Sequence, residues 1–174
     1  LQWNHCFKIN NGFIRNGHNV CTFSDRDMSR MNLINKLNNN KNLNKSLIET
    51  FKNFYPDIVV LGHADKIHNE TLNEFRSINK DIKIIEWNVD NYYLDNTEDK
   101  FKKRSHLIDA FFITNADENL KSCLTQNNSI SFFPNIFDKS IEHMRIFESA
   151  DYTYDVFYAL SYGVGTGKIR KSKS

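Results

Sequence analysis

The sequence predicts an α/β fold in which a parallel sheet carries helices on both faces, a Rossmann-like, doubly wound arrangement. Two observations lead to this prediction. Short apolar runs alternate along the chain with longer stretches whose apolar residues recur at helical spacing. The short runs are also continuously apolar, as at residues 58–61, whereas a strand with one face in water alternates apolar and polar residues. Strands buried on both faces belong to parallel sheets whose strands are joined by helices.

The first part of the chain predicts two helices and two strands. Apolar residues within 4–16 indicate a helix that ends at Gly17, because glycine readily adopts the left-handed conformation found after helix ends. Residues 20–23 follow as a predicted strand. Apolar residues at helical spacing between 33 and 51 predict a second helix, and residues 58–61 predict the next strand. A doubly wound domain opens on a strand, so we expect that an opening strand belongs before the first helix.

The rest of the chain continues the alternation. Asn69 is a predicted N-cap, because its side chain can accept a hydrogen bond from the first turn of the helix that follows. The later predicted elements are a strand at 82–87, a basic helix at 100–106, a strand at 110–114, a helix after Asp117, a strand at 130–133, a short helix at 141–147 and a strand at 155–160.

Composition narrows the classes of protein that fit. The 174 residues include 23 basic and 21 acidic side chains, so the net charge of +2 gives no reason to expect a nucleic-acid partner. Three cysteines form no disulfide framework and indicate a reducing, cytoplasmic compartment. The apolar runs are far shorter than the roughly 18 residues that a membrane-spanning helix needs. No spacing of Cys and His matches a zinc site, so no metal is predicted.

Ligands of open parallel sheets bind beyond the carboxyl ends of the strands. This rule selects the candidate site residues, which are Asp25, Arg26, Asp27, His63, Asp65, Asn88, Asp90, Asn115 and Asn135. Asp25 and Arg26 can bind a ligand hydroxyl or phosphate, or can pair with their neighbours in a surface turn.

His63 follows a predicted buried strand and stands close to Asp65. An imidazole in that place can act as a general base near neutral pH, with the carboxylate orienting it. A turn histidine bonded to the backbone is the alternative. Residues 87–93 combine aromatic, amide and carboxylate groups at another strand end, as sugar sites do, although such aromatic side chains also cover the edge of a core.

Two further patterns are weaker. Residues 163–168 read Gly-Val-Gly-Thr-Gly-Lys, but Tyr162 and Ile169 break the phosphate-loop motif, and Lys168 breaks the dinucleotide motif. A glycine-rich turn beside lysine still suits phosphate through its free backbone N–H groups, and a flexible tail is the alternative. The basic residues 100–104 suit anionic lipid head groups or form a solvated helix face.

Three segments resemble GT-B glycosyltransferases, in the order in which that family has them. Residues 11–20 (Asn-Gly-Phe-Ile-Arg-Asn-Gly-His-Asn-Val) resemble its first helix and Gly-His-x-Val strand entry. Residues 56–61 (Pro-Asp-Ile-Val-Val-Leu) are similar to its next strand, and residues 154–164 resemble the strand and turn that open its second domain. The likeness is to bacterial family 1-like transferases related to spore-maturation and surface-polysaccharide proteins.

The resemblance implies the amino-terminal half of such an enzyme. Residues 1–150 would be the acceptor-side domain without its first strand, and 151–174 a linker and the start of the donor-binding domain. We therefore expect both termini to be cut edges and the chain to be inactive alone. The implied reaction transfers a sugar from a nucleotide-sugar co-substrate to a hydroxyl of a glycan or lipid-linked acceptor, in surface polysaccharide or glycan biosynthesis. The implied location is the cytoplasm, with peripheral contact at the inner membrane face.

The resemblance also implies roles for individual residues. His63 or Asp90 would be the catalytic base that takes the proton of the acceptor hydroxyl. The implied acceptor-binding residues are Asp25, Arg26, Asp65, Trp87, Asn88 and Asn115, and the implied donor-phosphate residues are Gly163, Gly165, Gly167 and Lys168. No cofactor is implied. Two alternatives stay open: a nucleotide-cofactor domain with Asp25 on a ribose, and a non-catalytic binding domain of flavodoxin-like shape.

Overall fold

The computed structural model describes residues 5–31, 38–62, 64–89, 97–115, 125, 128–143, 145, 148, 151, 153, 154 and 156. The chain divides into two compact units, Leu1–Asp138 and Lys139–Ser174. All the helices and strands named below belong to the first unit. The domain boundary near residue 150 stays a prediction.

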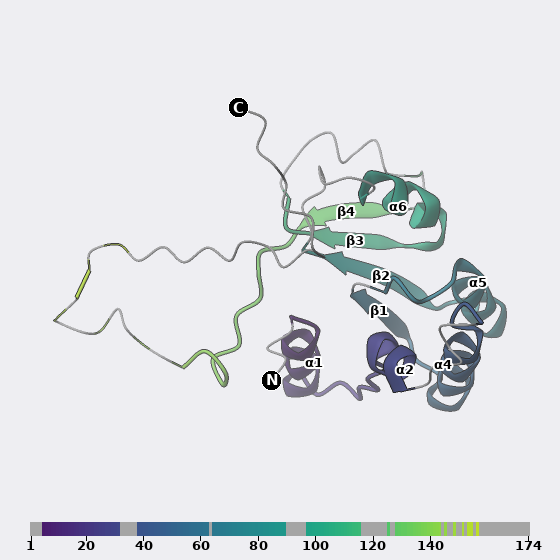
Figure 1. Ribbon diagram of the computed structural model, residues 1–174, viewed down its shortest axis with the longest axis horizontal. Coiled ribbons are helices and arrows are strands. Elements are labelled where there is room, and N and C mark those ends of the chain that lie inside the picture. Colours follow the sequence, from purple (N-terminus) through teal and green to yellow (C-terminus); the bar gives the residue numbers. More distant parts are fainter. Residues whose placement is uncertain are drawn as a thin grey trace. The chain divides into compact units, whose positions relative to one another are not determined.

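A four-stranded sheet forms the centre of the first unit. Its strands are β1 (Ile58–Gly62), β2 (Lys83–Asn88), β3 (Ala110–Ile113) and β4 (Ser129–Phe132). They lie in the order β1-β2-β3-β4, and every neighbouring pair is parallel, so that all the arrows in Figure 1 point the same way. This confirms the predicted α/β fold with a parallel sheet.

The register of the strands decides which residues meet. Gly62 lies opposite Trp87, and Asn88 lies opposite Ile113, so the carboxyl ends of β1, β2 and β3 stand nearly level. The loops that follow these strands therefore leave the sheet along one edge. This is the edge at which ligands of open parallel sheets bind.

Three helices pack on one face of the sheet, which we call the α4 face. They are α4 (Lys41–Phe54), α5 (Asn69–Ile78) and α6 (Thr97–Arg104), the last continued by a 3-10 turn, η1 (Ser105–Leu107). Phe51 of α4 stacks on Phe75 of α5, with ring centroids 4.2 Å apart. These rings join one apolar core with buried side chains of the strands, such as Leu61 and Ile84.

Helix α1 (His5–Arg15) packs against the opposite face of the sheet, beside the carboxyl end of β1. A Cβ built on Gly62 would lie 2.6 Å from Sγ of Cys6 and 3.7 Å from the ring of Trp87. Only glycine allows this approach of helix and strand. Helix α1 also holds the residues after β4, because Lys8 donates to the carbonyl of Ile136 at 3.1 Å and Arg15 pairs with the buried Asp138 at 2.8 Å.

Three predicted elements differ in the structure. Residues 20–23 are not a strand: 18–24 have no regular structure, since an extended segment becomes a strand only with a ladder partner. Asn69 is the first residue of α5, and His68 is the N-cap. The Asn69 side chain is occupied elsewhere, accepting from Nε of Arg104 and donating to the carbonyl of Lys103. Residues 141–143 form turn and coil instead of helix.

The close approach at Gly62 gives a first prediction. Gly62→Ala should lower the free energy of unfolding by about 1–3 kcal/mol, because the new methyl group overlaps Cys6 Sγ. The double variant with Cys6→Ala should recover most of that loss. Gly12→Ala is the control, because nothing lies within 4 Å of its Cβ position in the middle of α1, and it should stabilise by about 0.5–1 kcal/mol. Urea unfolding measures all four proteins. Equal losses in the single and double variants would contradict the contact.

Candidate functional site

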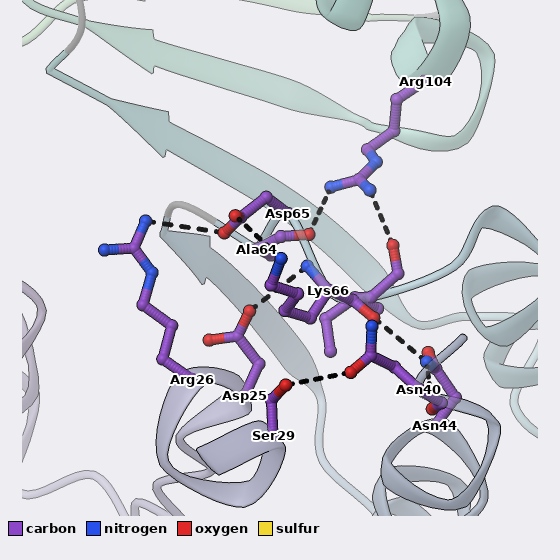
Figure 2. A network of polar contacts seen from close by, with 10 residues as sticks. Asp25, Arg26, Ser29, Asn40, Asn44, Ala64, Asp65, Lys66 and Arg104 are labelled. Carbon is purple, nitrogen blue, oxygen red and sulfur yellow. Dashed lines mark hydrogen bonds and ion pairs between the residues drawn. The ribbon is translucent and has the colours of Figure 1, made fainter. Parts of the chain in front are cut away.

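Four charged residues gather beside the carboxyl end of β1. Asp65 and Lys66 lie in the loop that follows the strand, and Asp25 and Arg26 begin the helix α2 (Asp25–Met31). Nη2 of Arg26 lies 3.5 Å from Oδ1 of Asp65, and Oδ2 of Asp25 accepts the Lys66 backbone N–H at 3.4 Å. Nζ of Lys66 lies 3.8 Å from the other Asp65 oxygen. Figure 2 shows these side chains converging, and we call them the edge cluster.

Local sequence explains why Asp25 and Arg26 point into the cluster while Asp27 does not. Ser24 caps α2, since its Oγ accepts the Asp27 N–H at 3.3 Å and donates to Oδ2 of Asp27 at 2.7 Å. This reciprocal cap turns the Asp27 carboxylate toward the start of its own helix. Asp27 also pairs with Arg30 at 3.8 Å. Only the first two residues of the charged triplet therefore remain for the edge.

Arg104, at the end of α6, holds the loop that carries Asp65 and Lys66. Its guanidinium donates to the carbonyl of Ala64 at 3.1 Å (Figure 2) and to the carbonyl of Ile67 at 2.8 Å. Its Nε also donates to Oδ1 of Asn69 at 3.3 Å. One planar group thus binds the loop at its start and at its end. Its nearest carboxylate is the mostly buried Glu86, at 3.9 Å. Burial raises the pKa of Glu86, and the Arg104 charge opposes this shift.

Asn44 holds the same loop from α4. Its side-chain amide donates to the carbonyl of Lys66 at 3.0 Å, and its Oδ1 accepts the His68 N–H at 2.9 Å. The same oxygen accepts the Thr71 hydroxyl at 2.8 Å. Asn44 is buried, so these bonds form without competition from water. Arg104 and Asn44 together fix the backbone of the loop and leave the side chains of Asp65 and Lys66 at the surface.

The edge cluster combines a perturbed carboxylate with weakly held cations. Burial raises the pKa of Asp25, and the Asp65 charge raises it further, while the Lys66 N–H and the Arg26 charge oppose the shift. The Arg26 and Asp65 side chains are 53% and 46% exposed. Ion pairs this exposed and this long contribute little to stability. Their charges can therefore turn toward a ligand at small cost, for example toward hydroxyl or phosphate oxygens.

The other predicted site residues lie in different settings. Trp87 is buried and packs against His5 of α1, with ring centroids 5.3 Å apart, so its ring faces α1. Asn88 ends β2 and Asn115 follows β3, both half-buried along the same edge of the sheet, and Asn135 is exposed after β4. Of the six predicted acceptor residues, the structure brings Asp25, Arg26 and Asp65 together.

Several predicted residues lie outside the described part of the chain. They are His63, Asp90, Gly163, Gly165, Gly167 and Lys168. The catalytic and donor-phosphate roles given to them stay predictions.

Sequence reasoning missed the two residues that hold the loop. Arg104 is the last residue of a basic run that suggests lipid contact or a solvated face, yet only 17% of its side chain is exposed. Asn44 lies in an asparagine-rich stretch where no single asparagine stands out. Lys66 was missed as well. Its place one residue after Asp65, beyond a buried strand, was the available signal.

Within the described residues, no group of three or more His, Cys, Asp or Glu side chains could hold a metal ion. In the same part of the chain, no helix combines the length and the apolar character needed to cross a membrane. No protein-family model, curated protein or solved structure matches this chain.

The raised pKa of Asp25 gives a second prediction. Asp25→Asn keeps an acceptor for the Lys66 N–H and removes a charge that burial disfavours. At pH 7 the variant should unfold with a free energy equal to or above that of the natural chain. The difference should shrink as the pH falls through the raised pKa of the folded Asp25 and disappear well below its ordinary pKa of about 3.9, because Asp25 is then protonated in both the folded and the unfolded chain. Urea unfolding between pH 3 and pH 8 measures this. A variant that is less stable at pH 7 would contradict it.

The contacts of Arg104 give a third prediction. Arg104→Lys keeps the positive charge but loses the planar guanidinium that binds two carbonyls at once. The free energy of unfolding should therefore fall by about 1–3 kcal/mol. In this variant, the backbone amides of residues 64–69 should also exchange faster with solvent than in the natural chain, and those of β3 should change less. Lys103→Gln is the control, because the Lys103 side chain is exposed on the same helix. Hydrogen exchange followed by NMR measures both variants, and equal exchange in the two would show that Arg104 does not hold the loop.

Proposed function

We propose that this chain is the acceptor-side domain of a GT-B glycosyltransferase, and that the edge cluster binds hydroxyl groups of a sugar acceptor. The observation that carries the proposal is the convergence of Asp25, Arg26, Asp65 and Lys66 beside the carboxyl end of a strand in a parallel sheet. The order of the three GT-B-like segments in the sequence supports the assignment to this class.

The chemistry of the cluster suits a polyhydroxylated ligand. A sugar hydroxyl donates to a carboxylate and accepts from a cation, and adjacent hydroxyls can use both kinds of group at once. Asp65 carries both of its oxygens near cations, at 3.5 Å from Arg26 and 3.8 Å from Lys66. Distances this long leave room for ligand oxygens to replace the ion pairs with shorter hydrogen bonds.

The proposed reaction needs a base, an acceptor and a donor. The base, His63 or Asp90, takes the proton of the acceptor hydroxyl, whose oxygen forms a bond to the anomeric carbon of the donor sugar. The bond from that carbon to the diphosphate breaks, and the nucleoside diphosphate leaves with the bonding electrons. Gly163, Gly165, Gly167 and Lys168 are the proposed contacts of that diphosphate. We place this reaction in surface polysaccharide or glycan biosynthesis at the cytoplasmic face of a membrane.

A second candidate function is the binding of a nucleotide cofactor. Asp25 is half-exposed at the edge of the sheet, where a carboxylate can accept both hydroxyls of a ribose. The two functions differ in their ligands, because a neutral saccharide tests the first and NAD tests the second.

The fourth prediction tests the proposed function. Saturation-transfer NMR with a panel of neutral mono- and disaccharides should detect binding to the chain. Asp65→Asn and Arg26→Gln should each weaken that binding by about tenfold or more, because each removes a charged partner of a ligand hydroxyl. Arg30→Gln is the matched control, since Arg30 lies on the same helix, is 66% exposed and pairs with Asp27.

Three outcomes of this experiment are informative. Loss of binding in the first two variants, with normal binding in Arg30→Gln, supports the edge cluster as the sugar site. Equal binding in all variants removes the cluster from the proposal. Saturable binding of NAD without any binding of saccharides favours the cofactor domain.

A further inference from the structure

We propose that the lateral edge of β1, which no strand of the described residues covers, is a strand-addition site, and that its occupant is an extended apolar peptide segment lying parallel to β1. The inference concerns an interaction surface of the sheet and does not depend on the proposed function. It rests on three observations: where the backbone N–H and C=O groups of β1 point, which side chains lie at its lateral edge, and the lack of regular structure in residues 18–24.

The first observation is the direction of the backbone groups. The Lys83 N–H donates to the carbonyl of Asp57 at 3.2 Å, and Ile58 pairs in register with Lys83. In a parallel ladder, the N–H and C=O of one residue point to the same side, and this side alternates along the strand. The backbone groups of Asp57, Val59 and Leu61 therefore face β2. Those of Ile58 and Val60 face the edge at which the described sheet ends.

The second observation is the apolar character of this edge on both faces of the sheet. Ile58 and Val60 are 49% and 37% exposed on the face where α1 packs against Gly62 and Trp87. On the α4 face, Val59, Phe23 and Met28 are only partly buried against the core. No charged residue, proline or bulge lies within β1 to protect it, although protein edges usually carry such features. An apolar strip on both faces suits a strand of the continuously apolar type.

The other edge of the sheet is different. Strand β4 reads Ser-Ile-Ser-Phe, so polar and apolar residues alternate between its two faces. The contrast favours β1 as the place where a further parallel strand of the same apolar kind as β1 fits. It also makes β4 a control within the same sheet.

The third observation concerns residues 20–23. They have the apolar composition of a strand but no ladder partner among the described residues, and Phe23 packs against the core of the sheet. A strand added to β1 has a second free edge of its own. That edge offers residues 20–23 the partner they need, so the addition of one strand accounts for both the open edge and the segment without regular structure.

The fifth prediction tests this site with the peptide acetyl-Lys-Val-Ile-Val-Ile-Val-Lys-amide carrying a benzophenone at its carboxyl end. Adding the peptide to the chain should slow the exchange of the Ile58 and Val60 amides by about tenfold or more, as measured by NMR. Amides of Val59 and Leu61, which already face β2, should change less. Photo-crosslinking should mark residues after Gly62, because parallel pairing brings the carboxyl ends together.

Two proline variants separate strand addition from general adhesion. Val60→Pro removes an N–H that faces the open edge and leaves the ladder to β2 intact, so the peptide should no longer bind. Phe132→Pro makes the same change on β4. The Ser129 and Phe133 N–H groups donate to the carbonyls of Asp109 and Ile113, so the Phe132 N–H, between them in the alternation, points away from β3. This control should leave peptide binding unchanged.

The outcomes decide the proposal even where Val60→Pro fails to fold, because the exchange and crosslinking experiments use the natural chain. Unchanged exchange of Ile58 and Val60 with saturating peptide overturns it. Crosslinks to residues 55–57 overturn the parallel direction. Slow exchange of the same amides that depends on protein concentration, without peptide, would show that a second copy of the chain occupies the edge instead.

Discussion

The hydrogen-bonded ladder of a parallel sheet is the constraint on which this structure depends. A strand inside such a sheet shares its backbone groups with two neighbours and buries side chains on both faces. Ile58–Gly62 is apolar throughout, and its partner strand buries Ile84 on one face and Trp87 on the other. Parallel pairing also brings all the carboxyl ends to one edge, where the charged residues gather. Where the ladder of the described strands stops, at β1, the β-branched residues Ile58 and Val60 are exposed.

The residues around the edge cluster divide into those that hold the loop and those that face solvent. Arg104 donates to the carbonyls of Ala64 and Ile67, and Asn44 binds the carbonyl of Lys66 and the N–H of His68. Asp65 and Lys66 are thereby held at their backbone, while their side chains stay half-exposed in long ion pairs. A rigid loop with loosely paired charges is a favourable arrangement for binding, because the ligand does not need to order the chain.

The fold was predicted more fully than the site, for a physical reason. Apolar periodicity is a local property, so the helix before Gly17 and the strands around Ile58, Trp87 and Phe111 could be predicted from the sequence. The predicted strand at 20–23 was wrong, because a strand also needs a partner that the local pattern does not supply. The strand-end rule predicts Asp25, Arg26 and Asp65. It does not predict Arg104, since nothing in a basic run shows which member turns inward.

The sequence by itself therefore determined the α/β class, the apolar strands and the placing of charged residues just beyond strand ends. Only the tertiary structure decided which of these charges meet and what holds them. The contacts of Arg104 with Ala64 and of Asn44 with Lys66 join residues 40 and 22 positions apart. Such distant pairs leave no periodic signal along the chain, because they depend on how α4, α6 and β1 pack together and not on the residues beside them.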